Sequence, residues 1–137
     1  MAKNKGVIYN NCINRYEGVK VMPIAAPHEI NTFLKQYRKL MFQPNKFHFQ
    51  PRTFDGITNL GLNIPDAKQM IKNLRYFQYD RGPVPDYNGD GIDVWEFGQP
   101  FEGRLIYIKL KIDPIEGCKC LSFKESTGPF TLPYRNW

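Results

Sequence analysis

Polar and aliphatic side chains alternate over residues 105–112 in a way that could arrange groups for chemistry on a phosphate. The polar positions hold Tyr107, Lys109 and Lys111, and the aliphatic positions hold Ile106, Ile108, Leu110 and Ile112. Successive side chains of a strand point to opposite faces, so this segment predicts a strand with one apolar and one polar face. Residues 120–124 alternate similarly and carry Ser122 and Lys124. Phenol and ammonium groups on one face can hold a phosphate and move a proton beside it.

The two segments form an antiparallel hairpin only if their apolar faces coincide, which restricts the register. The expected pairs are Leu105–Lys124, Ile106–Phe123, Tyr107–Ser122, Ile108–Leu121 and Lys109–Cys120. Opposite residues have Cβ atoms about 5 Å apart, so Tyr107, Lys109 and Lys124 would share one patch. The alternative is an ordinary solvated face of a half-buried sheet.

Length and composition indicate one basic domain. The chain has 137 residues, 42% of them hydrophobic, and a net charge of +6. We expect a single domain over 1–137, with an N-terminal extension at 1–26 and an irregular tail at 127–137. The basic balance favours an anionic partner. No segment is typical of a signal peptide or of a membrane span, which predicts a soluble, cytoplasmic protein.

The rest of the chain predicts helices, short strands and one long loop. The expected elements are helices at 27–43, 53–60 and 65–75, a short strand at 47–50, a loop at 79–94, and β-like runs at 7–9 and 19–22. Three cysteines, Cys12, Cys118 and Cys120, form no C-x-x-C pair. They are expected to be reduced structural thiols and not a zinc site.

Residues 86–91, DYNGDG, match the opening of a calcium-binding loop. Alternating oxygen ligands and a glycine at the turn are what such a loop requires. The twelfth position, however, is Phe97, and the acidic Glu96 comes one residue early. Turn chemistry explains Asp, Asn and Gly here equally well. A calcium-dependent interaction protein therefore remains one alternative function.

Several motifs together resemble the MqsR family, toxins of type II toxin–antitoxin pairs in the wider RelE-like group of ribonucleases. The motifs are Leu60-Gly61-Leu62, Gly82-Pro83-Val84-Pro85-Asp86, Trp95-Glu96-Phe97-Gly98, residues 103–112 and residues 120–125. The resemblance extends over roughly residues 27–126. It implies a compact single α+β domain in which helices pack on one face of a curved antiparallel sheet. It also implies cleavage of single-stranded mRNA without a metal or cofactor, and neutralisation by a cognate antitoxin.

The resemblance also implies roles for individual residues. Tyr107 and Lys124 match family positions that are thought to be catalytic. Glu96 falls where the best-known member has an active-site glutamine. That member has a further active-site lysine before its loop, for which Arg81 is the nearest replacement here. This departure leaves open a binding module of the same fold whose catalytic site has lapsed and that binds RNA or protein.

The expected chemistry is attack by a ribose 2′-OH on its own 3′-phosphate. Lys124 and Lys109 would stabilise the phosphate, with Lys124 also a possible general acid, and Tyr107 would position the 2′-OH or take its proton. Arg81 would clamp the phosphate, and Glu96 would act as base or hold Arg81. Glu96 could equally be a solvated or loop-fixing carboxylate. The candidate substrate-binding residues are Trp95, Ser122, Arg104 and Tyr87, and the alternative for Trp95 is a core anchor.

Overall fold

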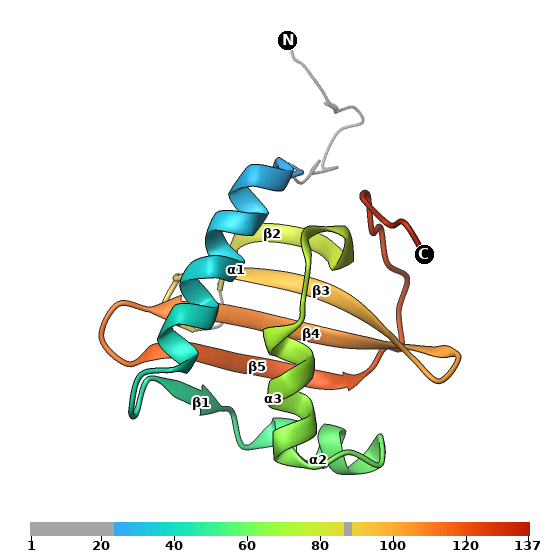
Figure 1. The fold of residues 1–137 in the computed structure, drawn as a ribbon, viewed down its shortest axis with the longest axis horizontal. Coiled ribbons are helices and arrows are strands. Elements are labelled where there is room, and N and C mark those ends of the chain that lie inside the picture. Colours follow the sequence, from blue (N-terminus) through green and yellow to red (C-terminus); the bar gives the residue numbers. More distant parts are fainter. Residues whose placement is uncertain (1–23, 87–88) are drawn as a thin grey trace, which may run out of the picture.

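Five strands form one mixed sheet in the computed structural model, which describes residues 24–86 and 89–137 (Figure 1). The strands are β1 (Phe47–Phe49), β2 (Tyr79–Pro85), β3 (Asp93–Phe101), β4 (Arg104–Asp113) and β5 (Gly117–Glu125). Their order is β1-β5-β4-β3-β2. All neighbours are antiparallel except β1 and β5, which are parallel. The expectation of a purely antiparallel sheet is therefore wrong at this edge, where a long crossover connects the two strands and permits parallel pairing.

Helices α1 (Pro27–Met41) and α3 (Ile64–Lys72) lie over one face of the sheet, and α2 (Arg52–Asn59) packs against β5 (Figure 1). All three occur where the sequence predicts a helix. Proline suits the first turn of α1, and the Glu29 carboxylate accepts a hydrogen bond from the Ala26 N–H at 2.7 Å. α3 begins with a reciprocal capping box between Asn63 and Asp66, and a single 3₁₀ turn, η1 (Tyr76–Gln78), follows it.

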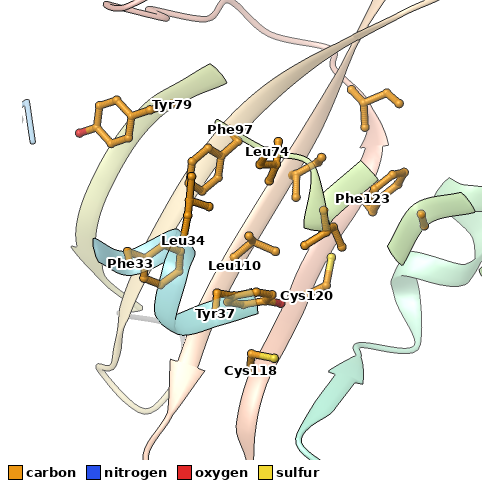
Figure 2. Close-up of a cluster of buried hydrophobic side chains, with 14 of the residues drawn as sticks. Phe33, Leu34, Tyr37, Leu74, Tyr79, Phe97, Leu110, Cys118, Cys120 and Phe123 are labelled. Carbon is orange, nitrogen blue, oxygen red and sulfur yellow. The ribbon is translucent and has the colours of Figure 1, made fainter. Parts of the chain in front are cut away.

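The core lies between the sheet and the two covering helices (Figure 2). The predicted aliphatic face of β4 is confirmed, because Ile106, Ile108 and Leu110 are fully buried. Cys118 and Cys120 are free thiols in the same core, and burial raises the pKa of the Cys118 thiol to about 12. Two further sequence features, Cys12 and the β-like runs at 7–9 and 19–22, lie outside the described residues.

The segment expected to be a loop at 79–94 contains the edge strand β2. Proline and glycine made this stretch resemble a loop, but an edge strand tolerates proline because one of its sides forms no ladder. Gly82 has φ +125, and a Cβ there would lie 2.7 Å from the carbonyl oxygen of Val94. β2 can therefore approach β3 so closely only with glycine at this position.

The hairpin of β4 and β5 has a different register from the one expected. Tyr107 pairs with Lys124, Lys109 with Ser122, and Ile108 with Phe123. The expected pairing is thus displaced by two residues at Tyr107. A bulge causes part of this difference: between the Lys109–Ser122 and Leu110–Cys120 pairs the ladder skips Leu121. The correction places Lys124 directly opposite Tyr107, closer than the sequence suggested.

The C-terminal segment 127–137 contains no helix or strand, as expected, yet it packs on the sheet. Figure 1 shows it rising from the end of β5 past β4 and β3. The Asp80 carboxylate accepts hydrogen bonds from the backbone N–H groups of Thr131 and Leu132, at 2.6 and 3.1 Å. Further along, the Tyr134 hydroxyl donates to the Ala25 carbonyl at 2.9 Å. This segment, called the tail below, is therefore fixed at two points.

Candidate functional site

A polar cleft of about 360 Å³ opens on the face of the sheet opposite α1 and α3. We call this face the outer face and this hollow the outer cleft. Tyr107 lies on the outer face because its neighbours Ile106 and Ile108 point into the core. The lining residues are Asp80, Arg81, Glu96, Tyr107, Lys124, Ser126 and tail residues 127–131. The structure thus brings four of the five expected catalytic residues, all but Lys109, into one cleft.

Arg81 and Glu96 form an ion pair at the floor of the outer cleft. Arg81 Nε lies 3.1 Å from Glu96 Oε2, and the side chain of Glu96 is 6% exposed whereas that of Arg81 is 49% exposed. The hydrogen bond to Glu96 raises the pKa of the Arg81 guanidinium, which stays charged. A bulge in β2 brings Arg81 opposite Glu96 and turns the preceding Asp80 toward the tail. The buried carboxylate is therefore oriented by, and ion-paired with, one guanidinium.

Tyr107 lies beside this pair with its phenol protonated at neutral pH. Burial is the main cause that raises the pKa of the Tyr107 hydroxyl, and the nearby Glu96 carboxylate is the second. The positive charge of Arg81 opposes them but is the smaller effect. The expectation that Tyr107 takes the 2′-OH proton is therefore not supported by its surroundings, whereas its positioning role is untouched. A protonated phenol is a hydrogen-bond donor or an acid.

The tail forms one wall of the outer cleft. The ring centroids of Phe130 and Tyr107 are 6.5 Å apart. Gly98, the neighbour of Tyr107 on β3, leaves room for the tail, since a Cβ there would lie 3.1 Å from both Phe130 and Leu132. Sequence reasoning missed this wall and the Asp80 that anchors it. Asp80 directly precedes Arg81, and this adjacency could have marked it as part of the site. Its hydrogen bonds to the backbone of the tail, in contrast, leave no pattern in the sequence.

Lys109 and Ser122 lie in a neighbouring groove of about 490 Å³ between α2 and β5, called the α2 groove below. They are paired across the β4–β5 ladder, and Lys109 also faces Glu96 across the β3–β4 ladder. Tyr107 and Lys124 line this groove as well as the outer cleft. Lys109 therefore lines the groove beside the outer cleft and does not line the cleft itself.

Three expected substrate-binding residues lie elsewhere or cannot be placed. Trp95 points to the core side of the sheet and stacks on Phe33, with ring centroids 4.6 Å apart. The alternative of a core anchor is thus the better description of Trp95. Arg104 forms ion pairs with Glu125 at 3.2 Å and Glu102 at 3.7 Å, and lines a separate hollow of about 640 Å³. Tyr87 lies outside the described residues.

The segment that resembles a calcium loop already contains a cation from the protein. Lys111 Nζ lies 3.0 Å from Asp90 and 3.6 Å from Asp86, and the lysine is only 5% exposed. The hydrogen bond from the backbone N–H of Ile92 is the main cause that lowers the pKa of the Asp90 carboxyl, and the hydrogen bond from Lys111 is the second. The ammonium thus pairs with the two carboxylates that a calcium ion would need. Elsewhere in the described ranges no group of three or more His, Cys, Asp or Glu side chains is arranged to hold a metal.

Comparisons with protein-family models, with curated proteins and with solved structures gave no match for this chain. The resemblance to the MqsR family therefore rests on the sequence motifs alone. Within residues 24–86 and 89–137, no helix combines the length and the apolar character that crossing a bilayer requires.

Proposed function

We propose that this protein is an RNA-cleaving toxin of the RelE-like, MqsR-like type, which cuts single-stranded mRNA without a metal ion. The observation that carries the proposal is the convergence of a phenol, an exposed ammonium and an oriented guanidinium–carboxylate pair in one cleft. Those groups belong to Tyr107, Lys124, Arg81 and Glu96. Together they supply a donor, two positive charges and a proton acceptor, which is the full set that transesterification of RNA requires.

In the proposed reaction, the ribose 2′-OH attacks the adjacent phosphorus and the bond from phosphorus to the 5′-oxygen breaks. The Glu96 carboxylate takes the 2′-OH proton, because it is the only carboxylate of the described cleft that is oriented by a cation and lies beside Tyr107. The departing 5′-oxygen is protonated by Lys124. The products are a 2′,3′-cyclic phosphate and a 5′-OH end.

Charge on the phosphate oxygens grows as the transition state forms, and the cleft offers donors for it. Arg81 can give two parallel hydrogen bonds while its Nε remains on Glu96. The Tyr107 O–H donates a third hydrogen bond, a role that its raised pKa favours. Removing one such donor from an active site usually costs about 100- to 1,000-fold in rate. This preorganised set is the reason to favour cleavage over simple binding.

The substrate is a single strand of RNA, since the chemistry needs a 2′-OH and the cleft volume suits one nucleotide and not a duplex. The net charge of +6 favours binding of a polyanion. The resemblance adds an antitoxin partner, and growth arrest on expression that Lys124→Ala relieves would support the toxin role. A Lys124→Ala protein that still arrests growth would contradict the assignment of Lys124.

The decisive experiment follows the cleavage of an end-labelled single-stranded RNA in EDTA by three proteins: the wild type, Lys124→Ala and Tyr107→Phe. Wild type should cut the RNA and leave cyclic phosphate ends, and each variant should be slower by about 100-fold or more. The same sequence made of DNA should remain intact. Circular dichroism and melting temperature control for folding. Absence of cleavage by the wild type would overturn the proposal.

A binding module with a lapsed site is the second candidate, and one observation favours it. The side chain of Glu96 is 6% exposed and paired with Arg81. In a binding module, this ion pair would have the purely structural role of joining β2 to β3. In that case the wild type, Lys124→Ala and Tyr107→Phe would all leave the RNA uncut. Fluorescence anisotropy with the same RNA would then show whether the cleft still binds it.

A further inference from the structure

The α2 groove is the feature that the proposed reaction leaves without a role. It is lined on the sheet side by Lys109, Ser122 and Lys124, and on the helix side by Arg52, Asp55 and Asn59. The geometry points to this groove as a nucleobase-binding subsite, which reads the base of a nucleotide next to the scissile phosphate through Asp55 and Asn59. This inference depends on the proposed ribonuclease function and adds a determinant of sequence preference to it.

The groove has a defined width because α2 is pressed against β5. A Cβ at Gly56 would collide with the carbonyl oxygen of Phe123, so only glycine allows this approach. The Arg52 guanidinium further joins the two elements, since its Nε donates to the Leu121 carbonyl at 2.8 Å. Leu121 is the residue that the β4–β5 ladder skips, and the bulge leaves its carbonyl for this contact. The helix side of the groove is thus held at a fixed distance from the sheet.

Continuity with the outer cleft makes a nucleotide the natural occupant. Tyr107 and Lys124 line both hollows, so a chain that places its phosphate at these residues has neighbouring groups that enter the α2 groove. Arg52, Lys109 and Lys124 supply three positive charges around the groove, against one negative charge from Asp55. This excess matches a phosphodiester backbone with a base attached.

Asp55 and Asn59 supply the hydrogen-bonding groups that a base edge needs. They stand four residues apart on α2, which places them on one side of the helix. Both are exposed, and neither side chain is hydrogen-bonded or ion-paired to any residue of the described part of the chain. An ionised carboxylate only accepts hydrogen bonds, whereas an amide both donates and accepts. The pair therefore suits a base edge that presents an N–H donor to Asp55 and a second hydrogen-bonding group to Asn59.

The test compares base preference in cleavage for wild type, Asp55→Asn, Asn59→Ala and the control Thr58→Ala. Thr58 is an exposed residue on the same helix that does not line the groove. A mixed-sequence single-stranded RNA is digested in EDTA, the fragment ends are sequenced, and kcat/KM is measured on four oligonucleotides that differ at one position beside the cut. Melting temperatures check that all four proteins are folded.

Wild type and Thr58→Ala should share one preference at a position beside the cut. Asp55→Asn and Asn59→Ala should lower kcat/KM by roughly 10- to 100-fold on the oligonucleotide with the preferred base. They should lower kcat/KM on the other three oligonucleotides much less. An unchanged preference, or an equal loss on all four bases, would overturn the subsite while leaving the ribonuclease proposal in place. Failure of the wild type to cut any RNA would defeat the proposed function, and the subsite with it.

Discussion

Lys111 and Lys124 occupy comparable outward positions on neighbouring strands, but their surroundings differ completely. Lys111 is 5% exposed and lies against two carboxylates, Asp86 and Asp90. Lys124 is exposed, borders two hollows, and has no ion pair among the residues that the structure describes. One ammonium is already neutralised by the protein, whereas the other remains available to an anion from solution.

The same contrast separates paired from available charge at the two ends of the outer face. Near the β4–β5 turn, the Lys111 ammonium is ion-paired with Asp90 and Asp86 and is almost fully buried. Near Tyr107, Arg81 is paired with Glu96 and Asp80 binds tail backbone, whereas Lys124 has no ion pair within the described residues and open volume lies beside it. Local charge balance together with space, and not the presence of lysine alone, distinguishes a candidate site from a solvated strand face.

The largest expected effect comes from replacing the lysine that lacks a partner. Lys124→Met should lower RNA cleavage by about 100-fold or more, because the phosphate loses a charge that no other group replaces. The melting temperature should stay within about 2 °C of wild type, since an exposed lysine adds little stability. Cleavage assays with thermal denaturation measure both. Retention of wild-type cleavage would mean that the two lysines do not differ in function.

The same substitution at the neutralised lysine should have the opposite effect. Lys111→Met should lower the free energy of unfolding by about 1–3 kcal/mol, because two carboxylates lose their shared cation. Cleavage per folded molecule should match the wild type. Chemical denaturation gives the stability, and adding Asp86→Asn to Lys111→Met should recover part of it. A loss of cleavage without a loss of stability would contradict this assignment.

Releasing the tail should have a smaller, mixed effect. Asp80→Ala removes the acceptor for the N–H groups of Thr131 and Leu132, which should cost about 1–2 kcal/mol of stability and slow cleavage by about 10-fold. Asp80→Asn retains an acceptor oxygen and should resemble the wild type more closely. Hydrogen exchange at Thr131 and Leu132 reports on the tail directly. Equal protection in Asp80→Ala and wild type would show that Asp80 does not anchor it.

The smallest expected effect concerns pH. Since the pKa of Tyr107 is raised in the folded protein, folding favours the protonated phenol. Its stabilising contribution is fully present below the unfolded pKa of about 10 and is lost as pH rises above that value toward the folded pKa. The free energy of unfolding should therefore fall less steeply above pH 10 in Tyr107→Phe than in wild type. Identical slopes would mean that Tyr107 titrates normally.

The sequence predicted those parts of the fold that produce a clear periodicity. The helical spacing over 27–41 and the alternation over 106–112 gave α1 and β4, because both elements have one apolar side. β2 was missed because an edge strand can contain Pro83 and Gly82, which are typical of loops. The register was wrong in part because a bulge at Leu121 does not interrupt the run of strand-forming residues.

The candidate site was predicted in part, for reasons of the same kind. Tyr107, Lys124, Arg81 and Glu96 do line one cleft, since three of them lie on the polar face of alternating strands and the fourth directly faces Glu96. Trp95 was wrongly expected to bind substrate. Because neighbouring residues of a strand point to opposite faces, Trp95 must face the core when Glu96 faces the cleft. The tail wall and the α2 groove could not be predicted, since both depend on contacts between segments far apart in the chain.

Leu121, the additional residue in β5, determines how the β4–β5 hairpin would respond to a change in length. Cys120 faces the core and Ser122 the outer face, with Leu121 skipped between them. Deleting Leu121 would therefore leave an uninterrupted ladder in which Phe123 still points inward and Lys124 still meets Tyr107. The shortened protein would retain the Tyr107–Lys124 pair but lose the carbonyl that anchors Arg52. If the proposed function and the base subsite both hold, shortening the chain by one residue would thus separate RNA cleavage from base preference.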